Sequence, residues 1–216
     1  MTPLASYRRL LDIAGPTYVL VAFVGRLPLA MSQLGTLLLV STASGSYGLG
    51  GLSAGALAVA NAVGAPVAGS LADRVGQRPV VLVQSLLGAT GLALLVAVVG
   101  GDAAPTTVVL TAAATGLLLP QVGPLARVRW RPLTRTTGAN QRRLVDAAFS
   151  YEGAADEASF AIGPALVGLS IAAFSPGGAM LLAAVLLAVF GSAFALDPSA
   201  RLTHAAERPA GTGRLL

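Results

Sequence analysis

Three acidic side chains stand close together in a stretch of sequence that is otherwise apolar. Glu152 and Asp156 are four positions apart, so on a helix they share one face, and Glu157 follows directly. A charge at the middle of a bilayer costs at least about 2.5–3.5 kcal/mol, so a carboxylate there should face protein or water and find a partner. Arg26 is the one basic residue that falls inside a long apolar segment. We therefore expect Arg26 to approach Glu152 or Asp156 inside the protein.

Two roles are open for such a group of charges. A carboxylate that becomes neutral when it is desolvated, and ionises beside an Arg, can act as a coupling switch in a proton or substrate site. The same residues can instead form a static ion pair near the cytoplasmic interface, which would hold the first and fifth apolar segments together. Both roles predict the same contact, and they differ in whether replacing Arg26 changes the activity.

The side chains needed for several other kinds of chemistry do not occur in the sequence. There is no Cys, which excludes disulfides, thiolate catalysis and thiolate metal sites, and the only histidine, His204, lies in a polar C-terminal segment. No Gly-rich loop with the Gly-Lys-Ser pattern of a nucleotide site is present. The sequence therefore predicts neither an enzyme, nor a metal site, nor a bound cofactor.

The composition is typical of a membrane protein. Of 216 residues, 55% are apolar and only 11% are charged, whereas a soluble domain carries roughly 25% charged residues. All 14 basic residues are Arg, and the net charge is +5. These Arg stand between apolar segments rather than on one solvated face, which argues against nucleic acid as a partner. The expected partner is the lipid bilayer.

Six apolar segments predict an all-α membrane protein, because about 20 helical residues span the ~30 Å hydrocarbon core. Barrel strands need only about 9–11 residues of alternating polarity, a pattern that these segments lack. We expect residues 1–197 to form a six-helix transmembrane bundle and residues 198–216 to be a disordered cytoplasmic tail. The predicted spans are residues 15–39, 49–71, 80–99, 106–125, 147–174 and 178–196.

The Arg residues mark one side of the predicted membrane. Counted on alternate sides of the spans, 13 of the 14 Arg fall on the side that holds both termini, while Arg26 lies inside the first span. Six of the 13 crowd the long connection between Arg127 and Arg143. Because basic loop residues stay on the cytoplasmic side, we expect a multi-pass protein of the plasma (inner) membrane with both termini in the cytoplasm.

The connection after the second span carries a turn pattern made of Gly69, Asp73, Arg74, Gly76 and Arg78. Asp73 can face a helix N-terminus, and Gly76 supplies a backbone conformation that other residues resist. Gly69 leaves room for a close helix contact. The simplest interpretation is an ordinary cytoplasmic turn with two Arg as orientation signals.

The run from Gly69 to Arg78 also resembles the signature of the major facilitator superfamily of transporters, at the position between spans two and three where that family carries it. The segment Tyr151–Pro164 resembles the fifth span of certain actinobacterial members. The resemblance implies the N-terminal six-helix half of the major facilitator fold, a 3+3 inverted repeat. It also implies that Asp73 gates the cytoplasmic side by contacting a helix end in the second half, with the other motif residues in support. Pro79 departs from the pattern, which often has a second basic residue there.

Two uncharged polar residues fall at membrane depth in the predicted spans, Gln33 in the first and Gln121 in the fourth. Interhelical hydrogen bonds are one explanation. The first and fourth spans line the central cavity in the family that the chain resembles, so contact with a substrate is the other. A faint internal repeat, Gly64–Gly69 in span two and Gly163–Gly168 in span five, is what nested three-plus-three repeats would give.

The function expected from these features is secondary active transport of a small solute by alternating access. We expect proton coupling, as in an antiporter or exporter, so that the partners are a small-molecule substrate and protons. The family has two six-span halves, so a second six-helix half or a second copy of the chain is also expected. The alternative is a non-transporting membrane bundle or an inactive truncated half of a transporter.

Overall fold

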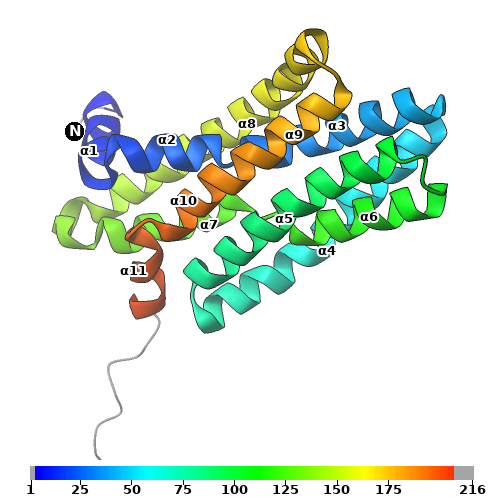
Figure 1. Ribbon diagram of the computed structural model, residues 1–216. Helices are drawn as coiled ribbons and strands as arrows, with labels where there is room; N and C mark the ends of the chain where they lie inside the picture. Colours follow the sequence, from blue (N-terminus) through cyan, green and yellow to red (C-terminus); the bar gives the residue numbers. More distant parts are fainter. Residues whose placement is uncertain (1–2, 207–216) are drawn as a thin grey trace, which may run out of the picture.

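The computed structural model describes residues 3–206, and in this part of the chain every regular element is helical (Figure 1). The elements are α1 (Pro3–Ala14), α2 (Pro16–Val24), α3 (Leu27–Ser44), α4 (Tyr47–Val75), α5 (Gln77–Gly100), α6 (Pro105–Leu118), α7 (Val122–Leu133), η1 (Arg135–Asn140), α8 (Gln141–Ala173), α9 (Pro176–Leu186), η2 (Leu187–Gly191), α10 (Ser192–Leu196) and α11 (Ser199–Ala206).

Six helical stretches in the described part of the chain are long and apolar enough to cross a membrane, which confirms the prediction of six membrane helices. We number them spans 1 to 6: Pro16–Ser44, Tyr47–Val75, Gln77–Gly100, Pro105–Leu133, Arg135–Ala173 and Pro176–Leu196. Most run several residues past their predicted ends, because helical structure continues where the apolar pattern stops. The chain thus has the architecture of a multi-pass helical membrane protein.

Span 1 is interrupted, which corrects the prediction of a continuous helix over residues 15–39. The first part, α2, ends at Val24, and the second part, α3, begins at Leu27. Pro28 has no N–H to bond to the Val24 carbonyl, and its ring clashes with that carbonyl. The helix therefore breaks at the two residues between, and one of these is Arg26.

Span 4 is also interrupted, where a continuous helix over residues 106–125 was predicted. The first part, α6, ends at Leu118, and α7 begins at Val122. Leu119 has extended backbone angles (φ −72°, ψ 122°) because it precedes Pro120, whose ring excludes the helical conformation at the residue before it.

Helical structure extends further at the Arg-rich end of the bundle than the sequence indicates. The connection predicted as a long basic loop is mostly helix, since α7, η1 and α8 follow one another closely. The prediction of disorder from residue 198 is wrong for Ser199–Ala206, which forms α11. The rest of the predicted tail, residues 207–216, and the side chain of His204 lie outside the described residues. Figure 1 shows α1 and α11 at this end, running across the direction of the spans.

Small residues bring the spans close together. Span 1 packs mainly against spans 2, 5 and 6, span 4 packs mainly against spans 2, 3 and 5, and spans 3 and 6 pack against each other. At Gly163 of span 5, an added Cβ would stand 2.6 Å from the Cβ of Ala30 in span 1. At Gly64 of span 2, it would stand 2.8 Å from the carbonyl oxygen of Leu117 in span 4. No side chain fits at either glycine, because the backbones are in close approach.

Spans 2 and 5 are the least covered by the rest of the protein. In the most apolar part of each span, 22% of residues in span 2 and 28% in span 5 are buried, against 44–61% in the other four. Gly69 of span 2 and Gly168 of span 5 both have open space where a Cβ would be. One face of each of these two spans is therefore free of contacts within the described chain.

The close approach at Gly163 predicts a difference between two alanine substitutions in the same helix. Gly163→Ala should lower the free energy of unfolding by about 1–3 kcal/mol, because the new methyl group overlaps Ala30. Gly168→Ala adds the same methyl group in open space and should leave stability unchanged or slightly raise it. Unfolding by sodium dodecyl sulfate in mixed micelles, followed by circular dichroism, measures both. Equal stability of the two variants would contradict the packing described.

Candidate functional site

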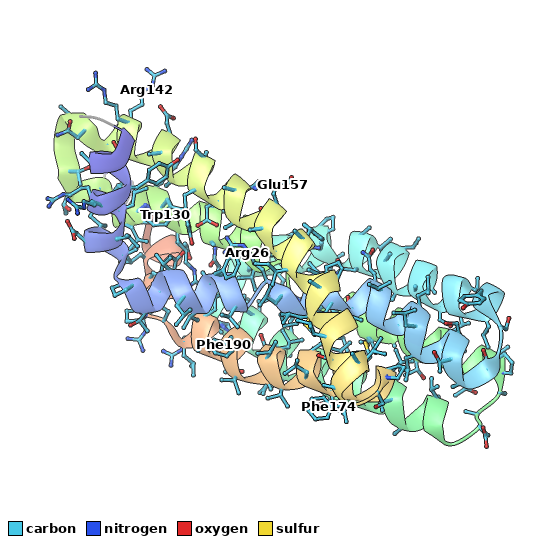
Figure 2. All side chains as sticks on the ribbon, turned by 90° about the horizontal axis from the view of Figure 1, so that it is seen from above. Arg26, Trp130, Arg142, Glu157, Phe174 and Phe190 are labelled. Atoms are coloured by element: carbon cyan, nitrogen blue, oxygen red, sulfur yellow. The ribbon has the colours of Figure 1, made fainter. Side chains whose placement is uncertain are left out.

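The guanidinium group of Arg26 lies at the helix break of span 1 and is paired with both carboxylates that the sequence predicted for it (Figure 2). Its Nε donates to Oδ1 of Asp156 at 2.9 Å, and its second terminal nitrogen donates to Oε2 of Glu152. The remaining nitrogen donates to the carbonyl oxygen of Ala22 at 2.9 Å. The Arg26 side chain is only 3% exposed, so the predicted contact is confirmed as a buried one.

The helix break also explains why a carbonyl oxygen is available to Arg26. The backbone N–H of Arg26 bonds to the carbonyl of Phe23, at 3.1 Å, instead of to that of Ala22 four residues back. The Ala22 carbonyl is then free to accept from the Arg26 side chain. The interruption caused by Pro28 therefore supplies one of the partners that a buried guanidinium needs.

Glu152 is fully buried and has a second partner that the sequence did not reveal. The indole N–H of Trp130 in α7 donates to Oε1 of Glu152 at 2.5 Å. Trp130 is itself buried, and its ring makes edge contacts with Tyr18 and Tyr151 at centroid distances of 5.8 and 6.4 Å. The inner carboxylate thus has both oxygens occupied, one of them by an indole that packs against two tyrosine rings.

Asp156 is the carboxylate that the surroundings can reach. Its side chain is 23% exposed, and its Oδ2 accepts from a terminal nitrogen of Arg127 at 2.5 Å. The Arg127 side chain is 43% exposed. The five groups form one continuous path from the surface inward: Arg127, Asp156, Arg26, Glu152 and Trp130. We call these five residues the ion-pair network.

The ion-pair network contains two guanidinium groups and two carboxylates, so its charges balance. A buried pair of this kind contributes little net stability, because the desolvation of the charges offsets their attraction, yet removing one partner alone is strongly destabilising. Protonation of a carboxylate has the same effect as removing its charge. Loss of the charge of the partly exposed Asp156 would therefore leave Arg26 with Glu152 as its one carboxylate partner.

A glycine makes room for the exposed carboxylate. At Gly123, near the start of α7, an added Cβ would stand 2.4 Å from Oδ1 of Asp156. The α7 backbone and the Asp156 carboxylate are therefore in direct contact, which holds Oδ1 toward Arg26. Neither Gly123 nor Arg127 was picked out from the sequence, because α7 was assigned partly to a loop and its Arg residues to membrane orientation.

A second buried arginine, Arg129, makes hydrogen bonds only to neutral groups in the described part of the chain. Its guanidinium group donates to Oε1 of Gln77, the Phe194 carbonyl and Oγ of Ser199, at 2.9, 2.9 and 3.1 Å. It also lies over the ring of Phe194, with 3.6 Å from Cζ to the ring centroid. Arg129 thus ties the start of span 3 to the end of span 6 and to α11. The alternation Arg127, Arg129, Arg131 gave no signal that its middle member is buried.

Three of the predicted proton or substrate residues are not part of the network, and two of these, Glu157 and Gln33, are exposed. Glu157 lies on the outer side of α8 (Figure 2), and Gln33 lies on α3. Neither side chain has an ion pair or hydrogen bond within the described residues. Whether either contacts a substrate stays a prediction.

Gln121 takes part in the interhelical hydrogen bonding that was one explanation for it. Its Nε2 donates to Oδ1 of Asn61 in span 2 at 2.6 Å. The Asn61 amide donates in turn to the carbonyls of Gly116 and Leu119, at 3.1 and 2.9 Å. These carbonyls lie where span 4 is interrupted. The Gly116 carbonyl also accepts from the backbone N–H of Leu119, at 3.3 Å, whereas the Leu119 carbonyl has only Asn61 as a partner among the described residues.

The turn motif after span 2 is exposed at the Arg-rich end. Gly76 has φ 94° and ψ 152°, a backbone conformation in which a residue with a Cβ is strained, as predicted. Asp73 and Arg74 are exposed, Arg78 is half-buried, and none of the three has an ion pair among the described residues. The predicted close helix contact at Gly69 is not made within this part of the chain.

Comparison with known proteins finds no family model, no curated protein and no solved structure that matches this chain. The described residues also hold no group of three metal-ligating side chains. The fold and the site therefore define the molecule by themselves: a six-span helical membrane protein with a charge-balanced ion-pair network at the break in its first span.

The different burial of the two arginines in the network predicts different costs of removing them. Arg26→Met should lower the free energy of unfolding by about 3–5 kcal/mol, because Glu152 is left buried without its charge partner. Arg127→Met, which removes the partly exposed end of the network, should cost no more than about 1 kcal/mol. The detergent unfolding assay described above compares them directly. Similar losses in both variants would show that burial does not control the network.

Proposed function

We propose that the chain is one six-helix half of a secondary active transporter of the major facilitator type, which moves a small solute by alternating access coupled to protons. The observation that carries the proposal is the ion-pair network, in which a partly exposed carboxylate, Asp156, shares Arg26 with a fully buried one, Glu152. A charge-balanced group that a proton can unbalance is the element that coupled transport requires.

The network can supply part of the free energy that a conformational change needs. Removing one partner of a buried ion pair costs about 3–5 kcal/mol, and moving a two-state equilibrium from 1:99 to 99:1 requires about 5.5 kcal/mol. Asp156 is partly exposed, and Arg26 keeps Glu152 and the Ala22 carbonyl when the charge of Asp156 is lost. Protonation of Asp156 would therefore supply a part of this free energy, below the value for a fully buried pair.

The positions of the helix breaks support a transporter over a passive bundle. Discontinuous helices in transporters commonly mark binding and coupling sites, and Arg26 lies at the break of span 1. The break of span 4 holds the second polar group of the bundle, Gln121 with Asn61. Spans 1 and 4 are the first members of the two triplets that the sequence suggests.

The pattern of helix neighbours supports the 3+3 inverted repeat. Exchanging spans 1, 2 and 3 with spans 4, 5 and 6 turns the neighbours of span 1, which are spans 2, 5 and 6, into the neighbours of span 4. The same exchange relates the close contact of Gly64 with span 4 to that of Gly163 with span 1. It also relates the open positions of Gly69 and Gly168. These are the glycines that begin and end the two similar sequence segments.

The partner we propose is a second six-helix half or a second copy of the chain, seated on the open faces of spans 2 and 5. Asp73 is exposed and unpaired among the described residues, as expected for a residue that contacts a helix end of that partner and gates the cytoplasmic side. Gln33, exposed on span 1, would then face the space between the halves and contact the substrate.

A second candidate function is a membrane bundle that does not transport, and one observation favours it. Both carboxylates of the ion-pair network and all three guanidinium nitrogens of Arg26 have partners, so the buried part of the network needs nothing further for a structural role. The two candidates differ in whether removing the charge of Asp156 changes the conformation.

The proposed topology predicts which connections a membrane-impermeant maleimide reaches in intact cells. The sequence has no Cys, so single cysteines report without a background. Ala104→Cys, between spans 3 and 4, should react from outside. Thr136→Cys, at the Arg-rich end, should react only after the membrane is made permeable. The opposite pattern would place the termini outside the cell and overturn the orientation.

Removing the charge of Asp156 should change the accessibility of Gln33 and Ser70 in opposite directions. Asp156→Asn keeps the shape of the side chain and removes the charge that a bound proton would remove. We expect the maleimide reaction rates of Gln33→Cys and Ser70→Cys, measured in lipid nanodiscs, to move oppositely when Asp156→Asn is added, because Arg26 and Arg127 then lose a charge partner. Ala104→Cys serves as a site whose rate stays constant.

If Asp156→Asn changes neither rate, the static bundle is the better description. Circular dichroism of each variant separates a change of conformation from unfolding.

A further inference from the structure

One buried amide in span 3 has no partner in the described part of the chain. The side chain of Gln84 belongs to a residue that is 8% exposed, and neither its N–H groups nor its carbonyl oxygen makes a hydrogen bond there. The amide atoms are not fully enclosed, so a molecule in an adjoining hollow can reach them. An unpaired amide on a residue that is otherwise buried is available to a ligand.

Gln84 borders two adjoining hollows. The smaller, of about 160 Å³, lies between spans 2, 3 and 4, and Gln84, Gln121, Gly69 and Pro124 are among the residues that line it. The larger is a groove of about 440 Å³ along spans 2 and 3. Ala68 and Gln84 line both, so the two hollows meet at the unpaired amide.

The second amide of the smaller hollow has a defined orientation. Both N–H groups of Asn61 are used by backbone carbonyls, so its Oδ1 must accept, and Gln121 must donate to it through Nε2. The carbonyl oxygen of Gln121 is then left without a donor in the described residues. Gln84 offers both donors and an acceptor, and Gln121 offers an acceptor, so the hollow matches a small uncharged hydrogen-bonding group.

The groove is apolar and open along the side of the bundle. It is lined chiefly by aliphatic side chains and a proline: Val63, Val67, Leu71, Val75, Pro79 and Val83. No charged residue lines either hollow, which disfavours a carboxylate, phosphate or ammonium group. The groove volume alone falls in the range of about 300–1,000 Å³ that is usual for small-molecule sites.

We propose that these two hollows form one binding site for a neutral amphiphile. Its apolar body lies in the groove along spans 2 and 3, and its uncharged polar head, such as a hydroxyl or an amide, hydrogen-bonds to Gln84 and Gln121. A neutral amphiphile is the substrate class that we infer for the proposed transporter. Transport of this substrate rests on the proposed function, whereas binding to the site does not.

A second groove provides an internal comparison. It has a similar volume, about 470 Å³, and lies between spans 3 and 4, with Thr90 and Thr115 among its lining residues. Both hydroxyls are satisfied within their own helices, at 2.8 Å to the carbonyls of Leu86 and Thr111. Thr107 and Thr111 also line this groove; their hydroxyls make no hydrogen bond within the described residues, but neither residue is buried. The two grooves are therefore matched in size, and the unpaired amide of a buried residue, Gln84, distinguishes the proposed site.

The test uses an eight-carbon alcohol that carries a photoreactive diazirine, with the full chain in phosphatidylcholine nanodiscs and labelled residues mapped by mass spectrometry. We expect saturable labelling of the groove of spans 2 and 3. Gln84→Leu should raise the half-saturating concentration about tenfold. The variant should still fold, because the change removes an amide that has no partner in the described residues. Thr90→Val, in the comparison groove, should leave labelling unchanged.

Three results would overturn the site. The first is that the matching hydrocarbon without the hydroxyl labels the groove as strongly as the alcohol, which would mean that any lipid chain occupies it. The second is that Gln84→Leu leaves labelling unchanged. The third is that a segment of protein occupies the groove and is crosslinked there instead. None of these changes how the cysteine variants respond to Asp156→Asn. If Asp156→Asn changes neither cysteine rate while the alcohol still binds, transport is overturned and the site stands.

Discussion

A guanidinium group inside an apolar bundle needs its charge balanced and its N–H donors satisfied, and the protein meets both needs for Arg26. Two carboxylates from span 5 and one backbone carbonyl from span 1 surround it. That set of partners requires the break in span 1, the approach of α8 and the small residue at Gly123 on α7. Spans 1, 4 and 5 are therefore held in register by electrostatics, in a bundle whose other contacts are almost all apolar and direction-free.

Elsewhere in the bundle, glycines lie where helices meet, so no side chain separates the two backbones. Gly64 and Gly163 let backbones approach until no Cβ fits, and they place the two triplets of spans in related positions. Spans 2 and 5 also carry small residues on their open faces. The molecule thus combines one tightly fixed polar centre with two flanks where small residues have nothing of the described chain to pack against.

The number of membrane helices and the approach of Arg26 to Glu152 and Asp156 were predictable, because both follow from the cost of polar groups in lipid. The roles of Trp130, Arg127 and Arg129 were not. Their alternation within a basic run reads as orientation signal, and only the continuation of α7 decides which of them turns inward. The breaks in spans 1 and 4 lie near prolines visible in the sequence, but whether a proline kinks, breaks or is tolerated depends on what satisfies the freed carbonyls. Here Arg26 and Asn61 do so.

Trp130 is the only tryptophan in the chain, and its indole N–H bonds directly to the buried carboxylate of the network. Indole emission responds to the charge and polarity next to the ring. The unmodified protein therefore carries its own optical reporter at the innermost point of the ion-pair network. Any proton or solute that disturbs Glu152 should therefore change the emission of this single fluorophore. The measurement needs no added label, and no other tryptophan contributes to the signal.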